Sequence, residues 1–365
     1  MTNWEQLVQE EQQMAQLRIQ LLDWYRRNRR DLPWRRTPDP YAIWVSEIML
    51  QQTRVAVVVE RYQAFLRRFP TLLSLAQAPE QDVLALWSGL GYDRRAHMLH
   101  RAARFVAAQL QGKLPVTSDE LRLLPGIGAY TAAAIASIAH GEVVAVVDGN
   151  VERVLCRLSG WEAGSRNGGG AAVRRKVEIL ASELIDPAQP GDFNQAMMEL
   201  GATVCVPRTP LCAQCPIAAH CQTKGEHKTA PRPRMMSREV AYALSLRGSG
   251  LPGPCDREVL LEQRPASQSV MPGLWELPPL CDPAVPAAQL HMTLRHAIMQ
   301  VNYYVRIRRL SQDEADALTE AGGERRWVSL LEARDMALTG LARKVLQRAR
   351  LLPLREVEVF LPAAD

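Results

Sequence analysis

Apolar residues recur at three- and four-residue steps along the first part of the chain, which is the spacing of amphipathic helices. The pattern is clear in residues 42–58, 82–86, 96–110 and 173–184. It predicts that residues 1–226 form a nearly all-α domain.

The pattern changes after a basic, proline-containing stretch. Residues 227–238 have the composition of an interdomain connector. Short alternating segments rich in Val, Tyr and Leu follow at 240–246, 258–262, 291–310 and 325–328, and a helical run covers 331–350. Residues 239–365 are therefore expected to form a smaller α/β domain.

Length and composition agree with two globular domains. The chain has 365 residues, of which 47% are hydrophobic and 23% charged, and no window approaches the roughly 18 apolar residues of a membrane span. Residues 1–30 contain Glu5, Glu10 and Glu11 and no apolar signal core. We expect no membrane partner and a cytoplasmic location, associated with the nucleoid in a bacterium. The formal charge of +5, carried mostly by arginine, is compatible with a polyanionic partner.

Four of the seven cysteines lie in one short segment. Cys205, Cys212, Cys215 and Cys221 are spaced C-x6-C-x2-C-x5-C. In a reducing compartment such a cluster indicates metal binding rather than disulfides. Structural zinc sites usually use two separated pairs, whereas iron–sulfur clusters accept uneven spacing on one loop. The spacing favours an iron–sulfur cluster over zinc.

A second motif predicts a helical hairpin. Thr117 and Glu120 have the spacing of a capping box, and Leu-Pro-Gly-Ile-Gly at 124–128 precedes an alanine-rich run, 129–140, that stops at Gly141. The two glycines, Gly126 and Gly128, would let the backbone approach a DNA phosphate at the start of the second helix. An ordinary helix–helix turn is the alternative interpretation.

Two carboxyl groups are candidates for chemistry. Asp148, in Val-Val-Asp-Gly-Asn-Val, precedes a predicted helix and is expected to cap it, which keeps the carboxylate negative and able to face a developing cation. Glu47 lies on an apolar helical segment, where desolvation would raise its pKa and suit it to donate a proton. A partly exposed Glu47 paired with Arg54 is the alternative.

Taken together, these motifs resemble the helix-hairpin-helix DNA glycosylases, and specifically the MutY family of adenine DNA glycosylases. The resemblance covers essentially the whole chain. It is carried by the cysteine loop, the hairpin and the segments LPWR (32–35), WVSEIMLQQTR (44–54), GLGY (89–92), VDGNV (147–151) and FNQAMMELG (193–201).

This resemblance implies a monomeric, monofunctional base excision repair enzyme that flips and removes adenine mispaired with oxoguanine or guanine in duplex DNA. It implies Glu47 as the general acid, Asp148 as the stabiliser of the oxocarbenium-like sugar, and Tyr130 and Asn150 as their helpers. It also implies a 4Fe-4S cluster on the four cysteines, in the loop 205–221. The matching substrate-binding positions are Leu32, Trp34, Arg35 and Gln195 around the adenine, and Gln52 and Tyr92 beside its unpaired partner base.

The segments VLLEQR (259–264) and GLWELP (273–278) follow in the second domain. Mainly through these segments, that domain resembles a Nudix-type fold of the kind found in this family. The glutamate-rich metal-binding helix of Nudix hydrolases is missing, because only residues 281–290 fill its place. A Phe-Ser-His triplet that contacts oxoguanine in most relatives is replaced by Ile298-Met299-Gln300, so weak discrimination between oxoguanine and guanine is expected.

Other functions remain as alternatives. An endonuclease III-like glycosylase/lyase for oxidised pyrimidines needs an amine nucleophile in the hairpin helix, but no lysine lies in 124–140 and Tyr130 holds the matching position. A non-catalytic DNA-binding relative is disfavoured by the presence of both Glu47 and Asp148, and a zinc-stabilised Nudix hydrolase by the missing helix.

Overall fold

The computed structural model describes residues 3–161, 170–225, 234–248, 257–268, 270–298, 300–320 and 324–353. The chain forms two compact units. The first contains residues 1–77 and 98–231, and the second contains residues 78–97 and 232–365. None of the described helices is both long and apolar enough to cross a membrane.

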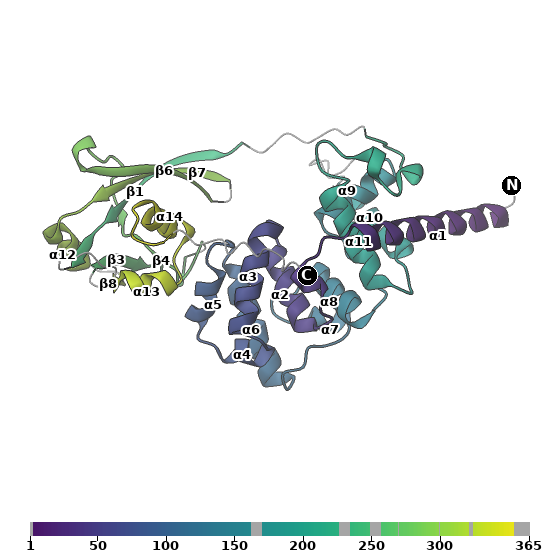
Figure 1. Ribbon diagram of the computed structural model, residues 1–365, viewed down its shortest axis with the longest axis horizontal. Helices are drawn as coiled ribbons and strands as arrows, with labels where there is room; N and C mark the ends of the chain where they lie inside the picture. Colours follow the sequence, from purple (N-terminus) through teal and green to yellow (C-terminus); the bar gives the residue numbers. More distant parts are fainter. Residues whose placement is uncertain are drawn as a thin grey trace, which may run out of the picture. The chain divides into compact units, whose positions relative to one another are not determined.

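The first unit is built from helices, as the apolar spacing predicts (Figure 1). They are α1 (Asn3–Asn28), α2 (Pro40–Leu50), α3 (Val55–Arg68), α4 (Leu72–Gln77), most of α6 (Arg94–Gln109), α7 (Ser118–Leu121), α8 (Ala129–His140), α9 (Gly149–Leu158), α10 (Gly170–Leu184) and α11 (Pro190–Thr203). Short 3-10 turns lie at η1 (Pro33–Arg35), η2 (Cys212–Gln214) and η3 (Ala218–His220).

Several helix boundaries follow from local chemistry. The side chain of Thr117 caps α7 by accepting from the backbone N–H of Glu120, and α8 ends at Gly141, whose φ of 71° suits a residue without Cβ. Asp148 caps α9 as expected.

The expectation of one helical segment over 42–58 is wrong. The chain leaves helical geometry after Leu50, and Gln52 adopts a φ of +55° in the turn before α3. Apolar periodicity continues across this turn because both helices face a core, so the pattern does not mark the break.

The core that supports the site joins α1, α9, α10 and α11. Its buried members include Leu21, Tyr25, Leu155, Val177 and Leu200. The partly buried Cys205, Cys215 and Cys221 pack against the same cluster. The segment after α11 is thus attached to the helices that carry Asp148 and its neighbours.

The second unit contains two sheets. One has the strand order β5 (Pro279–Leu280), β1 (Met236–Leu244), β7 (Val301–Arg309), β6 (Leu290–Ile298), and β1 and β7 run parallel from Met236↔Val301 to Leu244↔Arg309. The other has β2 (Leu246–Gly248), β3 (Arg257–Gln263) and β4 (Trp275–Glu276), with β8 (Arg325–Ser329) also paired to β3. Figure 1 shows α14 (Gly340–Arg348) lying between the sheets, and its buried Leu341, Val345 and Leu346 belong to the same core as residues of both.

This unit differs from the sequence-based expectation in four places. The segment 291–310 is a hairpin of β6 and β7, and the predicted helix 331–350 is interrupted between α13 (Leu330–Asp335) and α14. Helix α12 (Gln312–Glu320) was not expected. Residues 78–97, with α5 (Glu80–Trp87), join the second unit although they precede it by more than a hundred positions. In the place of the Nudix helix, residues 281–290 contain the short turn η5 (Ala287–Gln289) and the first residue of β6.

Candidate active site

A cavity of about 750 Å³ lies in the first unit. It is bordered by η1, by α2 and the turn after it, by the first turns of α8 and α9, and by α11. Its lining includes nine of the residues predicted from the sequence, which are Leu32, Trp34, Arg35, Glu47, Gln52, Tyr130, Asp148, Asn150 and Gln195. Segments far apart in the chain therefore converge on one space.

Glu47 is buried in the wall of this cavity, with 5% of its surface exposed. Its Oε2 accepts a hydrogen bond of 2.6 Å from the hydroxyl of Tyr130. Burial raises the pKa of Glu47 to about 7. The hydrogen bond from Tyr130 lowers this pKa in part, and the nearby charge of Asp148 raises it further. Glu47 is therefore not the partly exposed carboxyl of the alternative interpretation. It is buried, and its hydrogen-bond donor is the phenol of Tyr130.

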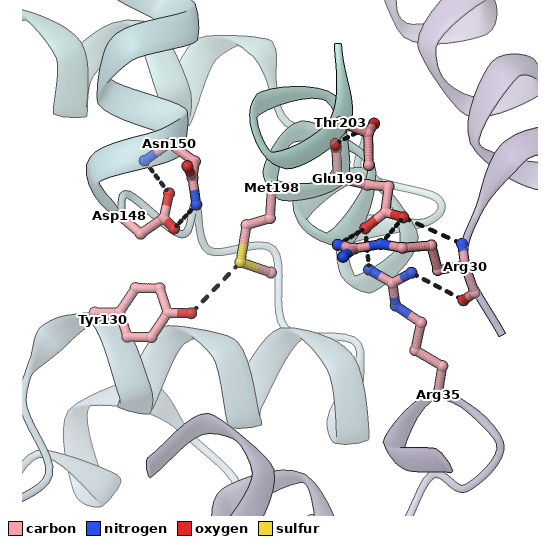
Figure 2. A network of polar contacts seen from close by, with 8 residues as sticks. All are labelled: Arg30, Arg35, Tyr130, Asp148, Asn150, Met198, Glu199 and Thr203. Atoms are coloured by element: carbon pink, nitrogen blue, oxygen red, sulfur yellow. Dashed lines mark hydrogen bonds and ion pairs between the residues drawn. The ribbon is translucent and has the colours of Figure 1, made fainter. Parts of the chain in front are cut away.

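Tyr130 stands in the first turn of α8. Besides its bond to Glu47, its hydroxyl lies 3.5 Å from Sδ of Met198 (Figure 2). Burial and the neighbouring carboxyl of Glu47 raise the pKa of Tyr130 well above its usual value. The phenol therefore stays protonated and acts as a donor to Glu47.

Asp148 is held at the N-terminus of α9 by three donors. Its Oδ1 accepts from the backbone N–H groups of Asn150 (2.8 Å) and Val151 (2.7 Å), and its Oδ2 accepts from Nδ2 of Asn150 at 2.9 Å (Figure 2). These bonds fix the orientation of the carboxylate at the positive end of the helix dipole. Capping and a charged role in the cavity are therefore compatible.

Asn150 also connects this site to the cysteine segment. Its Oδ1 accepts a 2.9 Å hydrogen bond from Nη2 of Arg153, whose Nε donates to the carbonyl of Cys205 at 2.9 Å. Gly201 packs tightly beside it, because a Cβ there would lie 2.7 Å from Cβ of Asn150.

A buried ion-pair network forms another wall. Glu199, 1% exposed, accepts 2.7 Å hydrogen bonds from Nε and Nη2 of Arg30 and a 2.9 Å bond from Nη2 of Arg35 (Figure 2). These bonds lower the pKa of Glu199 to about 2, despite the opposing effect of burial. The sequence analysis included Arg35 but missed Glu199 and its pairing with Arg30. The sequence does contain a signal for this pairing, because Glu199 lies between apolar residues of α11. A glutamate in such a position is expected to be buried and to need a cationic partner.

The remaining predicted lining residues differ in environment. Leu32 and Trp34 are buried, and the Trp34 ring packs edge-on against Tyr62 with centroids 5.4 Å apart. Gln195 is half-buried on α11, and Gln52 is exposed in the turn after α2.

Three predicted residues lie outside the cavity lining. Gly126 and Gly128 are exposed in the hairpin between α7 and α8. Gly126 has a φ of +79°, and a Cβ there would lie 2.7 Å from Cβ of Met98, so both the turn and the packing require glycine. Tyr92 belongs to the second unit.

The four clustered cysteines line a separate cavity of about 210 Å³. Among the described residues, no group of three or more His, Cys, Asp or Glu is arranged to hold a metal ion. The four cysteines border this space together with Arg157. Arg157 lies beside this space, with Nη1 3.3 Å from Sγ of Cys205 and 2.8 Å from the carbonyl of Val206.

Of residues 298–300, which match the relatives' Phe-Ser-His triplet, the structure describes two. Ile298 closes β6 opposite Val301, and the carbonyl of Gln300 accepts from the N–H of Met236 at 2.9 Å. Met299 lies outside the described residues.

Comparison with known proteins agrees with this geometry. The model of the HhH-GPD superfamily of base excision DNA repair proteins matches residues 45–176. The human adenine DNA glycosylase is 48% identical over 221 residues, which are 58% of this chain and 40% of that protein. The Mycolicibacterium smegmatis adenine DNA glycosylase is 43% identical over 205 residues, covering 56% of this chain and 68% of that protein.

A solved structure of a thermostable thymine-DNA glycosylase is also similar. It superposes with a TM-score of 0.53 and 28% identity, covering 59% of this chain and 98% of that one. The matched part spans about 40% of the length of the human, rat and mouse relatives. By its identity to a bacterial relative over two thirds of that protein, together with the superfamily match, this chain belongs to the adenine DNA glycosylase family within the HhH-GPD superfamily.

Proposed function

We propose that this protein is a monofunctional adenine DNA glycosylase, which removes adenine from duplex DNA where it is mispaired with guanine or oxoguanine. One observation carries the proposal: the buried carboxyl of Glu47, whose pKa is raised, and the carboxyl of Asp148, which caps α9, line the same cavity. Cleaving an N-glycosidic bond needs a proton for the leaving base and a negative group beside the developing sugar cation, as in glycoside hydrolysis.

Glu47 supplies the proton. With a pKa of about 7 it is substantially protonated at neutral pH and still acidic enough to transfer its proton to adenine N7 as the bond lengthens. Tyr130 holds the carboxyl through Oε2 and leaves Oε1 for the base.

Asp148 stabilises the oxocarbenium-like sugar. Because three donors already hold its carboxylate, its orientation is fixed before the substrate binds. Asn150 contributes two of these donors, its backbone N–H and its Nδ2, and its side chain is itself positioned by Arg153.

The cavity accepts the extruded adenine. Leu32 and Trp34 provide apolar surface, and Arg35 and Gln195 provide polar groups for the edge of the base. Flipping costs a few kcal/mol of unstacking, which insertion of Gln52 and Tyr92 beside the partner base offsets. The exposed hairpin backbone at Gly126 and Gly128 binds a phosphate.

Cys205, Cys212, Cys215 and Cys221 hold a 4Fe-4S cluster. When bound, the cluster crosslinks the segment after α11 and adds to the stability of the fold. The cavity that the cysteines line and the guanidinium of Arg157 beside Cys205 support this assignment.

The C-terminal part acts as a Nudix-like recognition domain without hydrolase activity. We propose domain limits of 1–226 and 239–365 joined by the connector 227–238, and a monomeric protein in the cytoplasm. Since Ile298 and Gln300 replace part of a Phe-Ser-His triplet, discrimination between oxoguanine and guanine is weak.

Single-turnover cleavage tests the function. Purified protein is mixed with duplexes that place adenine opposite oxoguanine, guanine or thymine, and with a duplex that contains an oxidised pyrimidine. Release of adenine from the first two only is expected, with no covalent adduct on borohydride treatment. Cleavage of the oxidised pyrimidine, or an efficient borohydride adduct, would assign the endonuclease III-like activity instead.

A further inference from the structure

The segment that carries Tyr92 is attached to the C-terminal part of the chain. Residues 78–97 belong to the second unit, together with residues 232–365. The loop after α5 contains Gly89 (φ +98°), Gly91 (φ +71°) and Tyr92 itself (φ +52°). Tyr92 is 44% exposed at this position.

The loop begins at a buried polar connection. The hydroxyl of Ser88, 1% exposed, donates to the carbonyl of Leu338 at 3.0 Å and accepts from Nε of Arg343 at 3.2 Å. The two residues that meet here are separated by 255 positions in the chain.

Arg343 in turn holds the segment between α13 and α14. Its Nη1 donates to the carbonyl of Arg334 at 3.2 Å and its Nη2 to that of Met336 at 3.1 Å. Arg343 is 9% exposed, and its hydrogen bonds go to the Ser88 hydroxyl and to two backbone carbonyls. Burial lowers the pKa of Arg343, and the charge of Asp335 opposes this effect. A guanidinium buried at this cost and bonded to three separate segments holds those segments in position.

The other end of the loop is held by Arg95. Its Nη2 donates to the carbonyls of Gly91 (2.8 Å) and Leu90 (3.3 Å). The guanidinium also lies over the rings of Trp87 and Tyr92, 5.4 and 5.6 Å from their centroids. The loop is thus fixed at both ends, and its positive φ angles are maintained by these contacts.

We propose that Arg343, through Ser88, is a positioning residue for Tyr92, so that the C-terminal part of the chain sets how this tyrosine meets the base opposite the extruded adenine. The inference rests on the proposed function, because it assigns Tyr92 to the partner base. It makes recognition of that base depend on the contact between Ser88 and Arg343 as well as on residues 298–300. The chemistry of adenine release does not depend on it, because Glu47 and Asp148 lie in the other unit.

A double-mutant cycle tests the connection. The variants are Arg343→Met, which keeps most of the side-chain volume, Tyr92→Ala, and the double substitution. Binding is measured on a duplex with a non-cleavable adenine analogue opposite oxoguanine. Each single substitution is expected to weaken binding about tenfold, the effect of losing one base–aromatic stack, and the double variant no more than either single one. When the Arg343→Met protein is in saturating excess over the duplex, its single-turnover rate of adenine release should stay within about twofold of the wild-type rate, because only binding is changed.

Two controls separate positioning from a general loss of structure. Arg334→Met removes the same charge from an exposed side chain in the same unit and is expected to bind normally. A 2-aminopurine next to the partner base reports stacking directly, and its fluorescence change on binding should be lost in Arg343→Met and retained in Arg334→Met. Lower thermal stability of Arg343→Met does not affect this comparison, which is made below its unfolding transition.

The outcomes are distinct. Additive effects of Arg343→Met and Tyr92→Ala, or unchanged binding and fluorescence in Arg343→Met, would overturn the positioning role. Failure of the wild-type protein to release adenine would overturn the proposed function instead, and that reaction is measured in parallel.

Discussion

The hydroxyl of Tyr130 lies 2.6 Å from Oε2 of Glu47 and donates a hydrogen bond to it. This bond works against burial, because it favours the ionised carboxyl whereas desolvation disfavours it. The pKa of about 7 is the balance of the two effects.

Tyr130→Phe should therefore move the pH dependence of adenine release. Without the donor, the pKa of Glu47 rises further, so the decline in rate that accompanies its ionisation shifts to higher pH. The maximal rate should fall roughly tenfold, because a hydrogen bond to a charged group contributes roughly 1.5–3 kcal/mol. Single-turnover rates between pH 5 and 9 measure both effects.

Tyr41→Phe is the matched control. The hydroxyl of Tyr41 is also buried, but it donates to the carbonyl of Phe69, outside the cavity lining. Its pH profile should coincide with that of the wild type. If the pH profile of Tyr41→Phe shifts as much as that of Tyr130→Phe, the hydrogen bond from Tyr130 is not what sets the pKa of Glu47.

Glu47→Gln should remove activity and increase stability above pH 7. The folded protein holds a proton on Glu47 up to a pKa of about 7, whereas the unfolded chain releases it near 4.5. The free energy of unfolding of the wild type therefore falls as the pH rises through this window, by about 3 kcal/mol in total. Glutamine does not ionise and avoids this loss.

Urea unfolding at pH 5 and pH 8.5 measures the effect. The difference in stability between Glu47→Gln and wild type should be larger and more favourable to the variant at pH 8.5. An equal difference at both pH values would mean that Glu47 is not desolvated in the folded protein.

Asp148→Asn should stop adenine release while the fold and DNA binding remain. Asparagine caps helices as well as aspartate does, so α9 keeps its first turn, but the negative charge beside the sugar is lost. We expect a rate reduction of at least 10²–10³-fold, the range seen when one preorganised electrostatic group is removed. Asp39→Asn is the control, because Asp39 caps α2 by accepting from the N–H of Tyr41 and lies outside the cavity lining.

Cys212→Ser should lose the bound iron. Serine oxygen does not replace a thiolate ligand of an iron–sulfur cluster, and the protein should also lose stability. Cys281→Ser is the comparison, since Cys281 is exposed and lies outside the four-cysteine cavity. Equal iron content in the two variants, measured by elemental analysis and visible absorption, would contradict the ligand assignment.

Three features of the candidate site have a local signal in the sequence, whereas other residues, such as Tyr130, Asn150 and Gln195, entered only through the family resemblance. Asp148 precedes a helix, the hairpin glycines punctuate two helices, and Glu47 interrupts an apolar run. The structure confirms the cap of α9 and the limits of α8, and it places Glu47 and Asp148 on one cavity.

Features that depend on distant partners could not be predicted in this way. The pairing of Glu199 with Arg30 joins positions 169 apart, and the contact of Ser88 with Arg343 joins positions 255 apart. Apolar periodicity also missed the break at Gln52, whose φ is +55°, because the apolar spacing continues across this turn. The membership of residues 78–97 in the second unit is likewise a property of packing that no local motif records.

The Glu199 network gives a last prediction, on stability. Glu199→Gln leaves the guanidiniums of Arg30 and Arg35 beside a neutral amide in a site where the carboxylate side chain is 1% exposed. Breaking a buried pair from one side costs roughly 3–5 kcal/mol, and we expect the lower end because the side chain of Arg30 is 38% exposed. The pKa of about 2 means that this contribution is complete above pH 4.5 and is lost as the pH falls toward 2.

Asp31→Asn is the comparison for this prediction, because the Asp31–Arg36 pair has side chains that are 73% and 63% exposed. Solvent screens such a pair, so its loss should leave the urea midpoint unchanged. The free energy of unfolding of wild type and of Glu199→Gln is then measured at pH 7 and pH 3. The difference between the two proteins should be smaller at pH 3, because Glu199 is protonated in the unfolded chain at that pH and still ionised in the folded protein. A difference that stays constant between the two pH values would mean that the charge of Glu199 does not stabilise this wall of the cavity.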